Sequence, residues 1–106
     1  MEERRISKRV PFRSNVRFGP AEPPQFTALI TDISDTGTYI KSNRIFPAGT
    51  KLFLVIETPE GPFKAQGIVA WAKKAPPHLM RHMQSGMGIS FTEVDRGLID
   101  LYREKL

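Results

Sequence analysis

The chain contains no cysteine, so it forms no disulfide bridge and offers no thiolate ligand to a metal. It also lacks a long apolar run: no run is longer than Leu52–Ile56, which is far short of the roughly 20 residues that a membrane-spanning helix needs. The N-terminus lacks the apolar stretch of a signal peptide. From these absences we expect a protein without a membrane span, located in the reducing environment of the cytoplasm.

Positive charge is concentrated at one end of the chain. The net charge is +5, from 16 Lys and Arg against 11 Asp and Glu. Residues 1–17 hold six of the basic and two of the acidic residues, whereas residues 18–106 hold ten and nine. A protein that binds nucleic acid more often spreads its basic charge over a face of the fold. A basic arm favours a small dianion, although RNA or anionic lipid would also be attracted to it.

Short alternating segments predict a small β protein in this chain of 106 residues, which is the size of one domain. We expect residues 1–13 to form a flexible basic arm, and residues 14–106 to form a six-stranded antiparallel β-barrel with a C-terminal α-helix. The expected strands cover residues 13–18, 26–31, 38–41, 50–57, 63–71 and 87–91. Residues 32–37 are rich in Asp, Ser, Thr and Gly and predict a turn.

Local signals predict further details of the barrel. Gly67, inside an expected strand, indicates a bulge or a tight bend. Thr92, with Asp95 three residues later, predicts the start of the C-terminal helix. Residues 79–83 are expected to form a helical turn within the loop of residues 73–85.

Two groups of residues suit the chemistry of a guanine nucleotide. Arg5 and Arg9 lie four residues apart in the arm, and Asp32, Ser34 and Gly37 follow on the expected turn. Arginine forks match phosphate oxygens and the O6/N7 edge of guanine. An ionised carboxylate accepts hydrogen bonds, and guanine offers adjacent N1–H and N2–H donors. A glycine lets the backbone come close to a ligand.

The pattern R-x-x-x-R followed by D-x-S-x-x-G resembles the two motifs of the PilZ domain, a bacterial receptor for cyclic di-GMP. Residues 67–71 resemble the family's strand that ends in an aromatic residue, and residues 86–91 resemble its G-x-G-[IV]-x-F strand. The resemblance covers nearly the whole chain. It implies a PilZ-like barrel whose arm folds over the bound nucleotide.

The resemblance also assigns cyclic di-GMP binding to Arg4, Arg5, Arg9, Asp32, Ser34 and Gly37. Arg5 and Arg9 would clamp the phosphates and guanines, and Asp32 and Ser34 would bind one guanine. An arginine at Arg4, just before the motif, implies two stacked ligand molecules per chain. A solvated basic tail and an ordinary turn, closed by its own side-chain bonds, are the alternative interpretations of these residues.

Other chemistry finds little support in the sequence. We expect no enzyme and no catalytic residue, because the chain has neither a Gly-x-Ser-x-Gly elbow nor a phosphate-binding loop. His78 and His82 are four residues apart, a spacing that can bind a metal. We nevertheless expect no metal, because no third ligand is evident. No cofactor is expected besides the ligand cyclic di-GMP. Trp71 fits the core or the rim of the barrel, with stacking on the ligand as the alternative.

We therefore expect a bacterial, cytoplasmic receptor that binds cyclic di-GMP, orders its arm and signals to an unidentified protein partner. A PilZ-like adaptor that does not bind nucleotide is the first alternative. A small basic barrel that binds RNA or single-stranded DNA is the second. It ranks behind the first because the arm holds a single aromatic residue, Phe12, for bases to stack on.

Overall fold

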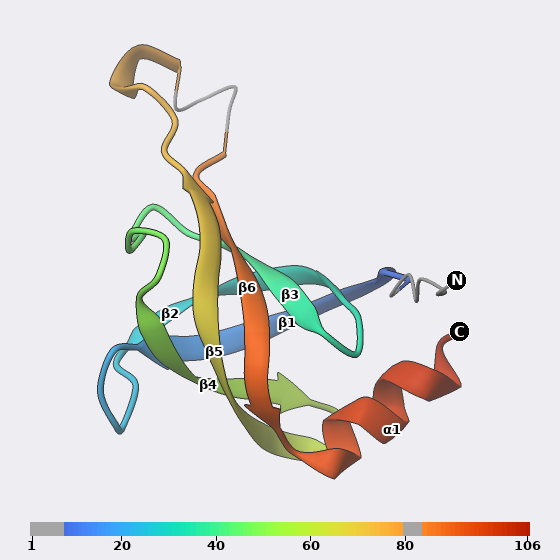
Figure 1. Cartoon of the computed structure of the whole chain (residues 1–106). Coiled ribbons are helices and arrows are strands. Elements are labelled where there is room, and N and C mark those ends of the chain that lie inside the picture. The colour runs from blue at the N-terminus through green and yellow to red at the C-terminus, as the bar shows by residue number, and fades with distance from the viewer. Residues whose placement is uncertain (1–7, 80–83) are drawn as a thin grey trace, which may run out of the picture.

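Six antiparallel strands close into a barrel in the computed structural model, which describes residues 8–79 and 84–106. The strands are β1 (Val10–Gly19), β2 (Phe26–Ile33), β3 (Gly37–Lys41), β4 (Lys51–Thr58), β5 (Gly61–Lys73) and β6 (Gly86–Val94). A helix, α1 (Arg96–Glu104), follows β6, and a 3-10 turn, η1 (Pro77–Leu79), lies in the loop before it. The strand order around the barrel is β1-β2-β3-β6-β5-β4 (Figure 1). The predicted six-stranded barrel with a C-terminal helix is confirmed.

Alternate side chains along the strands point into the barrel and fill it. In β4, Leu52, Leu54 and Ile56 are buried, whereas Phe53 and Val55 between them are half-buried on the outer face. Burying one such aliphatic side chain contributes about 1.5–3 kcal/mol, so this shared interior holds the strands together. The other strands and α1 also contribute to the core, with Phe18, Ile30, Ile40, Val69, Ile89 and Leu98 among the buried residues.

β1 begins earlier than its predicted start. Val10 already pairs with Ile33 of β2, and both Val10 and Phe12 are buried in the core. Residues 10–13, which the sequence placed in the arm, therefore form part of the barrel wall. Pro11 obscured this strand in the sequence because proline interrupts most strands. Here the pairing of β1 with β2 shifts its register just after Pro11, and such irregularities accommodate proline.

β5 and β6 form a long hairpin that extends beyond the other strands (Figure 1). The predicted irregularity at Gly67 is confirmed, because the register between the two strands shifts between Gln66 and Gly67. The described part of the loop between them carries a 3-10 turn at Pro77–Leu79, which overlaps the predicted turn of residues 79–83 at Leu79 alone. Proline favours the first position of a helical turn, where its missing N–H costs no hydrogen bond. Residues 80–83 of the predicted turn lie outside the described residues.

α1 begins later than predicted, so the expected cap at Thr92 is wrong. β6 continues to pair with β5 as far as Val94, and these ladder hydrogen bonds keep Thr92 in the strand. Asp95 instead precedes the helix as its N-cap residue. Its carboxylate makes no hydrogen bond to the helix and accepts one from the backbone N–H of Lys64 at 3.0 Å.

In the described parts of the chain, no helix has the length and apolar character to span a membrane.

Candidate functional site

Asp32 and Arg9, predicted as ligand-binding residues from two separate motifs, lie side by side. Asp32 is near the end of β2, and Arg9 directly precedes β1. A guanidinium N–H of Arg9 donates to Oδ1 of Asp32 at 2.9 Å, and the hydroxyl of Thr31 donates to Oδ2 at 3.1 Å. The side chains of Arg9 and Asp32 keep 45% and 31% of their surface exposed. Both charged groups are therefore accessible from solvent.

Ser34 shapes the turn between β2 and β3 with its hydroxyl. The Oγ accepts hydrogen bonds from the N–H groups of Thr36 (3.1 Å) and Gly37 (3.2 Å), as serine often does in turns. The turn is shorter than the predicted residues 32–37, because β2 extends through Ile33 and β3 starts at Gly37. Ser34 is 1% exposed. Its contact with a guanine stays a prediction, whereas its local bonding is observed.

Position 37 must be a glycine because the chain lies very close to β6 there. Gly37 pairs with Ser90, and a Cβ at this position would collide with the carbonyl oxygen of Ile89. The N–H of Phe91 donates to the carbonyl of Thr36 at 2.8 Å, which holds the turn against β6. The close approach that the glycine permits is thus an approach to a neighbouring strand. Its approach to a ligand stays a prediction.

Two aromatic side chains lie together on the strands that follow β2 around the barrel. Tyr39 of β3, the ladder partner of Asp32, and Trp71 of β5 both pair with Gly88 of β6, which runs between them. Their rings stack with centroids 5.5 Å apart and planes inclined by 26°. A Cβ on Gly88 would collide with the indole of Trp71, so the glycine makes room for the ring. Trp71 is 50% exposed and lies on the rim of the barrel rather than in the core.

The environment of Tyr39 makes its phenol harder to deprotonate. Burial, and secondly the charge of Asp32, raise the pKa of Tyr39 above its ordinary value of 10.0. The hydroxyl lies against Gly86, where an added Cβ would collide with it, and at neutral pH it can donate a hydrogen bond. Tyr39 was not among the site residues predicted from the sequence. Its only signal was an aromatic residue in a short strand, and its position opposite Gly88 depends on strand pairing.

A comparison with known protein families matches residues 3–105 to the PilZ domain. The chain belongs to the PilZ domain family. PilZ domains are binding and adaptor domains rather than enzymes, and the family includes domains that bind cyclic di-GMP. Arg4 and Arg5 of this PilZ domain lie outside the described residues, and their role stays a prediction.

Among solved structures, this PilZ domain is similar to the Bacillus subtilis inhibitor of motility (MotI/DgrA), itself a PilZ-domain protein. The TM-score is 0.75 at 20% sequence identity, and the match covers 97% of this chain. The chain spans 49% of the length of that protein, and the likeness is one of fold. A comparison with curated proteins gave no match.

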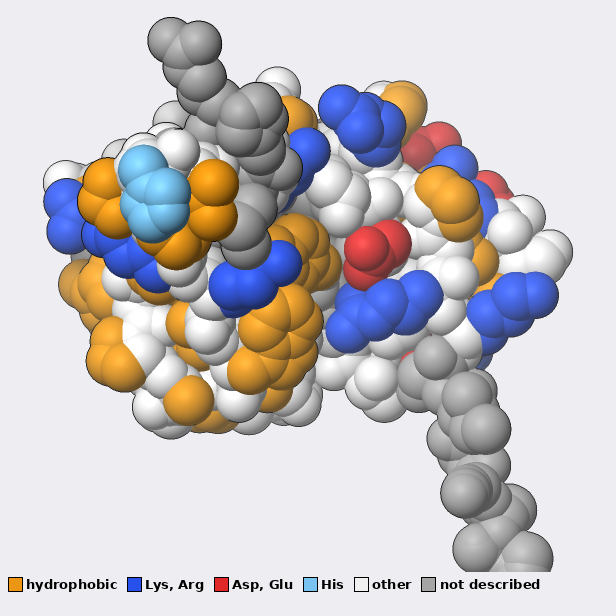
Figure 2. Space-filling model, turned by 90° about the horizontal axis from the view of Figure 1, so that it is seen from above, with side chains coloured by type: hydrophobic (Ala, Val, Ile, Leu, Met, Phe, Trp, Pro, Cys, Tyr) orange, Lys and Arg blue, Asp and Glu red, His pale blue; other side chains and the backbone are white. Residues whose placement is uncertain are grey.

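Two further basic residues lie near Arg9 in the sequence of this PilZ domain. Lys8 and Arg13, on either side of the Arg9–Asp32 contact in sequence, are both exposed. Figure 2 shows Lys and Arg side chains at several places over one face of the molecule, with hydrophobic side chains between them and fewer acidic ones. Such a face attracts anions.

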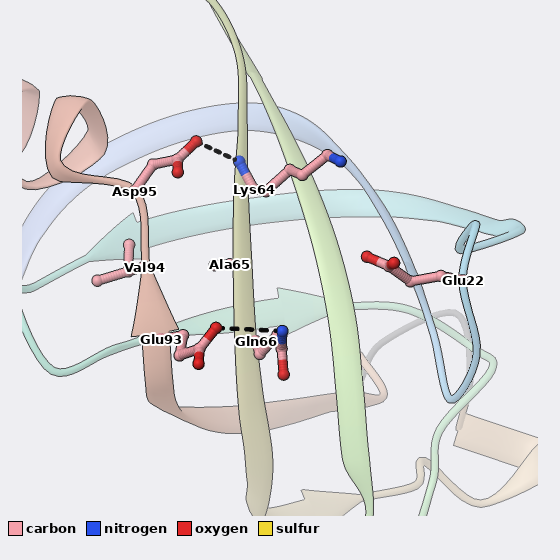
Figure 3. A pocket seen from close by; sticks show the side chains of 7 residues that line it. All are labelled: Glu22, Lys64, Ala65, Gln66, Glu93, Val94 and Asp95. Atoms are coloured by element: carbon pink, nitrogen blue, oxygen red, sulfur yellow. Dashed lines mark hydrogen bonds between the residues drawn. The ribbon is translucent and has the colours of Figure 1, made fainter.

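A pocket of about 470 Å³ on the outside of β5 and β6 has the opposite character (Figure 3). Glu22, Glu93 and Asp95 contribute three carboxylates to its lining, against the single ammonium of Lys64. Glu93 and Asp95 already accept hydrogen bonds, from the amide of Gln66 (3.2 Å) and the backbone N–H of Lys64 (3.0 Å). A lining with excess negative charge repels phosphate groups, so this pocket does not suit a dianionic nucleotide.

Proposed function

We propose that this PilZ domain is a receptor for cyclic di-GMP that orders its arm on binding and signals to a protein partner. The observation that carries the proposal is the 2.9 Å contact between Arg9 and Asp32. It joins the two motifs on one accessible surface. Tyr39, the ladder partner of Asp32, stacks on the exposed ring of Trp71. Membership of a family that includes cyclic di-GMP-binding domains supports the proposal.

The ligand is complementary to the groups at this surface. Cyclic di-GMP carries two phosphates and two guanines. The carboxylate of Asp32 can accept hydrogen bonds from N1–H and N2–H of a guanine, and the guanidinium of Arg9 can bind a phosphate or the O6/N7 edge. The rings of Tyr39, the ladder partner of Asp32, and Trp71 offer an apolar surface on the neighbouring strands. Charge and hydrogen bonding at this surface therefore favour a guanine nucleotide.

Binding would also order the arm. Fixing the backbone of one residue costs roughly 1–2 kcal/mol, so an arm is ordered only when new contacts offset that cost. Arg4, Arg5 and Arg9 supply such contacts when two phosphates are within reach of all three. Arg4 would stack on a guanine of a second ligand, giving two molecules per chain. The ordered arm presents a new surface to a protein partner.

Two alternative functions would require different features of the protein surface. In an adaptor that does not bind nucleotide, the Arg9–Asp32 contact would be an ordinary surface ion pair. A barrel that binds RNA or single-stranded DNA needs several exposed aromatic rings along a basic groove. Within residues 8–79 and 84–106, the exposed large hydrophobic side chains are Trp71 and Leu106. A single strand would therefore find one exposed ring on the described surface.

Calorimetric titration of the purified protein with cyclic di-GMP tests the proposal. GTP, cyclic di-AMP and a single-stranded oligonucleotide serve as control ligands. Saturable binding of cyclic di-GMP, with much weaker binding of the three controls, is expected. A folded protein that binds none of the four would leave the adaptor as the surviving function. Preferential binding of the oligonucleotide would favour the nucleic-acid barrel.

A further inference from the structure

The C-terminal helix is hydrogen-bonded to residues 8–10, which form the base of the arm. The phenolic hydroxyl of Tyr102 in α1 donates to the carbonyl oxygen of Lys8 at 2.7 Å, across 94 positions of sequence. In Figure 1 the start of β1 and the end of α1 lie on the same side of the barrel. The contact therefore links the helix to the segment that leads from the barrel into the arm.

α1 holds the ring of Tyr102 in place by packing. Tyr102 and Leu98 are buried in the same core cluster as Val10 and Phe12 of β1. The ammonium of Lys105 lies 5.6 Å from the centre of the Phe12 ring, which adds a contact between the end of the helix and β1. With its ring packed on these neighbours, Tyr102 presents its hydroxyl at a fixed position.

Three consecutive residues at the base of the arm each have a separate attachment. The carbonyl of Lys8 accepts from Tyr102, the side chain of Arg9 pairs with Asp32, and Val10 enters the β1 ladder. Lys8 and Arg9 are otherwise exposed, so packing does not fix them. The bond from Tyr102 therefore restricts a stretch of backbone that would otherwise sample many conformations.

We propose that Tyr102 is a positioning residue for the arginine arm. Through the carbonyl of Lys8 it fixes the backbone from which Arg9 reaches Asp32. A segment that is ordered before binding loses less conformational entropy when the ligand arrives, so the hydroxyl strengthens binding without touching the ligand. The effect on affinity rests on the proposed cyclic di-GMP function, whereas the effect on the arm's backbone does not.

The Tyr102→Phe variant tests this role, because it removes the hydroxyl and keeps the packed ring. A neutral hydrogen bond contributes about 0.5–1.5 kcal/mol, so the Kd for cyclic di-GMP should rise by about 2- to 12-fold. In protein without added nucleotide, amide hydrogen exchange at Arg9 and Val10 should accelerate by a similar factor. Exchange in β4 and β5, away from the arm, should stay unchanged.

Leu101→Ala is the matched control on the same helix. Leu101 is partly buried against the core, so its truncation lowers the melting temperature while the hydroxyl of Tyr102 remains. Its Kd should stay within about twofold of the unmodified protein when measured well below the melting temperature. A Tyr102→Phe protein that binds as tightly as the unmodified one would overturn the proposal. So would affinities that fall in step with melting temperature in both variants, because that pattern marks a purely structural role.

The exchange measurement separates this inference from the function it rests on. If the unmodified protein does not bind cyclic di-GMP, yet Tyr102→Phe alone accelerates exchange at Arg9 and Val10, the receptor function fails and the positioning of the arm is supported. Equal exchange rates at these two amides in the variant and the unmodified protein would overturn the positioning role as well.

Discussion

Arg9 and Asp32 form an ion pair 2.9 Å long on a surface where both side chains stay partly exposed. A second ion pair involving β1 has nearly the same character: Arg17 and Glu57 lie 3.0 Å apart with 45% and 44% of their side chains exposed. Exposed ion pairs of this kind contribute only about 0.2–1 kcal/mol to stability. The two pairs should therefore differ little in their importance for folding and greatly in their importance for ligand binding.

Alanine substitutions of the two pairs should separate these effects. Losing one charge-assisted hydrogen bond costs about 1.5–3 kcal/mol, so Arg9→Ala and Asp32→Ala should each weaken cyclic di-GMP binding by roughly 10- to 150-fold. Arg17→Ala and Glu57→Ala should leave the Kd nearly unchanged. Calorimetry gives the affinities and circular dichroism checks folding. Equal losses in the two sets would place the ligand elsewhere.

Cyclic di-GMP should raise the melting temperature of the domain. At a ligand concentration a hundred times the Kd, linkage gives about 2.7 kcal/mol of stabilisation. For a domain of this size the corresponding shift is on the order of 10 °C. Thermal denaturation with and without ligand measures it, and GTP at the same concentration should produce a much smaller shift. A folded protein whose melting temperature is unchanged by saturating cyclic di-GMP would contradict the receptor proposal.

Arg4 should set the number of ligands bound. Its flat guanidinium, next to Arg5, can cover a guanine of a second molecule, so we expect two cyclic di-GMP per chain. Arg4→Ala should reduce the calorimetric ratio to one or weaken only the second binding step, whereas Arg5→Ala should abolish both. A ratio of one in the unmodified protein, unaffected by Arg4→Ala, would leave Arg4 as a solvated charge.

Gly37 should be essential for stability whatever the ligand does. Because a Cβ there would collide with the backbone carbonyl of Ile89, Gly37→Ala should cost about 1–3 kcal/mol in the free energy of unfolding, as overpacking typically does. At Gly19 the nearest atom would lie 3.5 Å from an added Cβ, an ordinary contact, so Gly19→Ala should stay within about 0.5 kcal/mol. Urea denaturation of the two variants makes the comparison. Equal losses would show that crowding at β6 is not the reason for the glycine.

Tyr39 should make the domain less stable in alkaline solution. Its raised pKa means that the folded state holds the phenolic proton more strongly than the unfolded chain does. This stabilisation is complete below pH 10.0, the ordinary value, and is lost as the pH rises through the higher folded pKa. Between pH 9 and pH 11 the urea midpoint should fall more in the unmodified protein than in Tyr39→Phe. Parallel declines would assign the alkaline loss to other groups.

The barrel was predictable because its signals are local. Alternating apolar residues such as Leu52, Leu54 and Ile56 indicate a strand without reference to its neighbours. Strand ends were less predictable, because pairing overrides local preference. Pro11 suggested that β1 starts later and Thr92 suggested that β6 ends sooner, yet each strand continues wherever its partner supplies a ladder.

Part of the candidate site was predictable from local sequence, and part was not. Arg9 and Asp32 were identified from short motifs, and the structure brings them together. The stacking of Tyr39 on Trp71 was not predictable, because it depends on the register of three strands around one glycine. The bond from Tyr102 to Lys8 depends on where a helix docks after the barrel has closed, and no local pattern encodes that position.

The roles of Ser34 and Gly37 affect how relatives of this domain should be sorted. The serine hydroxyl closes the turn, and the glycine admits the backbone of β6, so both residues serve the scaffold even where no nucleotide binds. Natural selection would keep them in a domain that had lost its ligand. The side chains of Asp32 and Arg9, by contrast, form a partly exposed ion pair, so the scaffold depends on them less. A homologue that retains D-x-S-x-x-G without the arginine pair is therefore better classed as a barrel of unknown ligand than as a receptor.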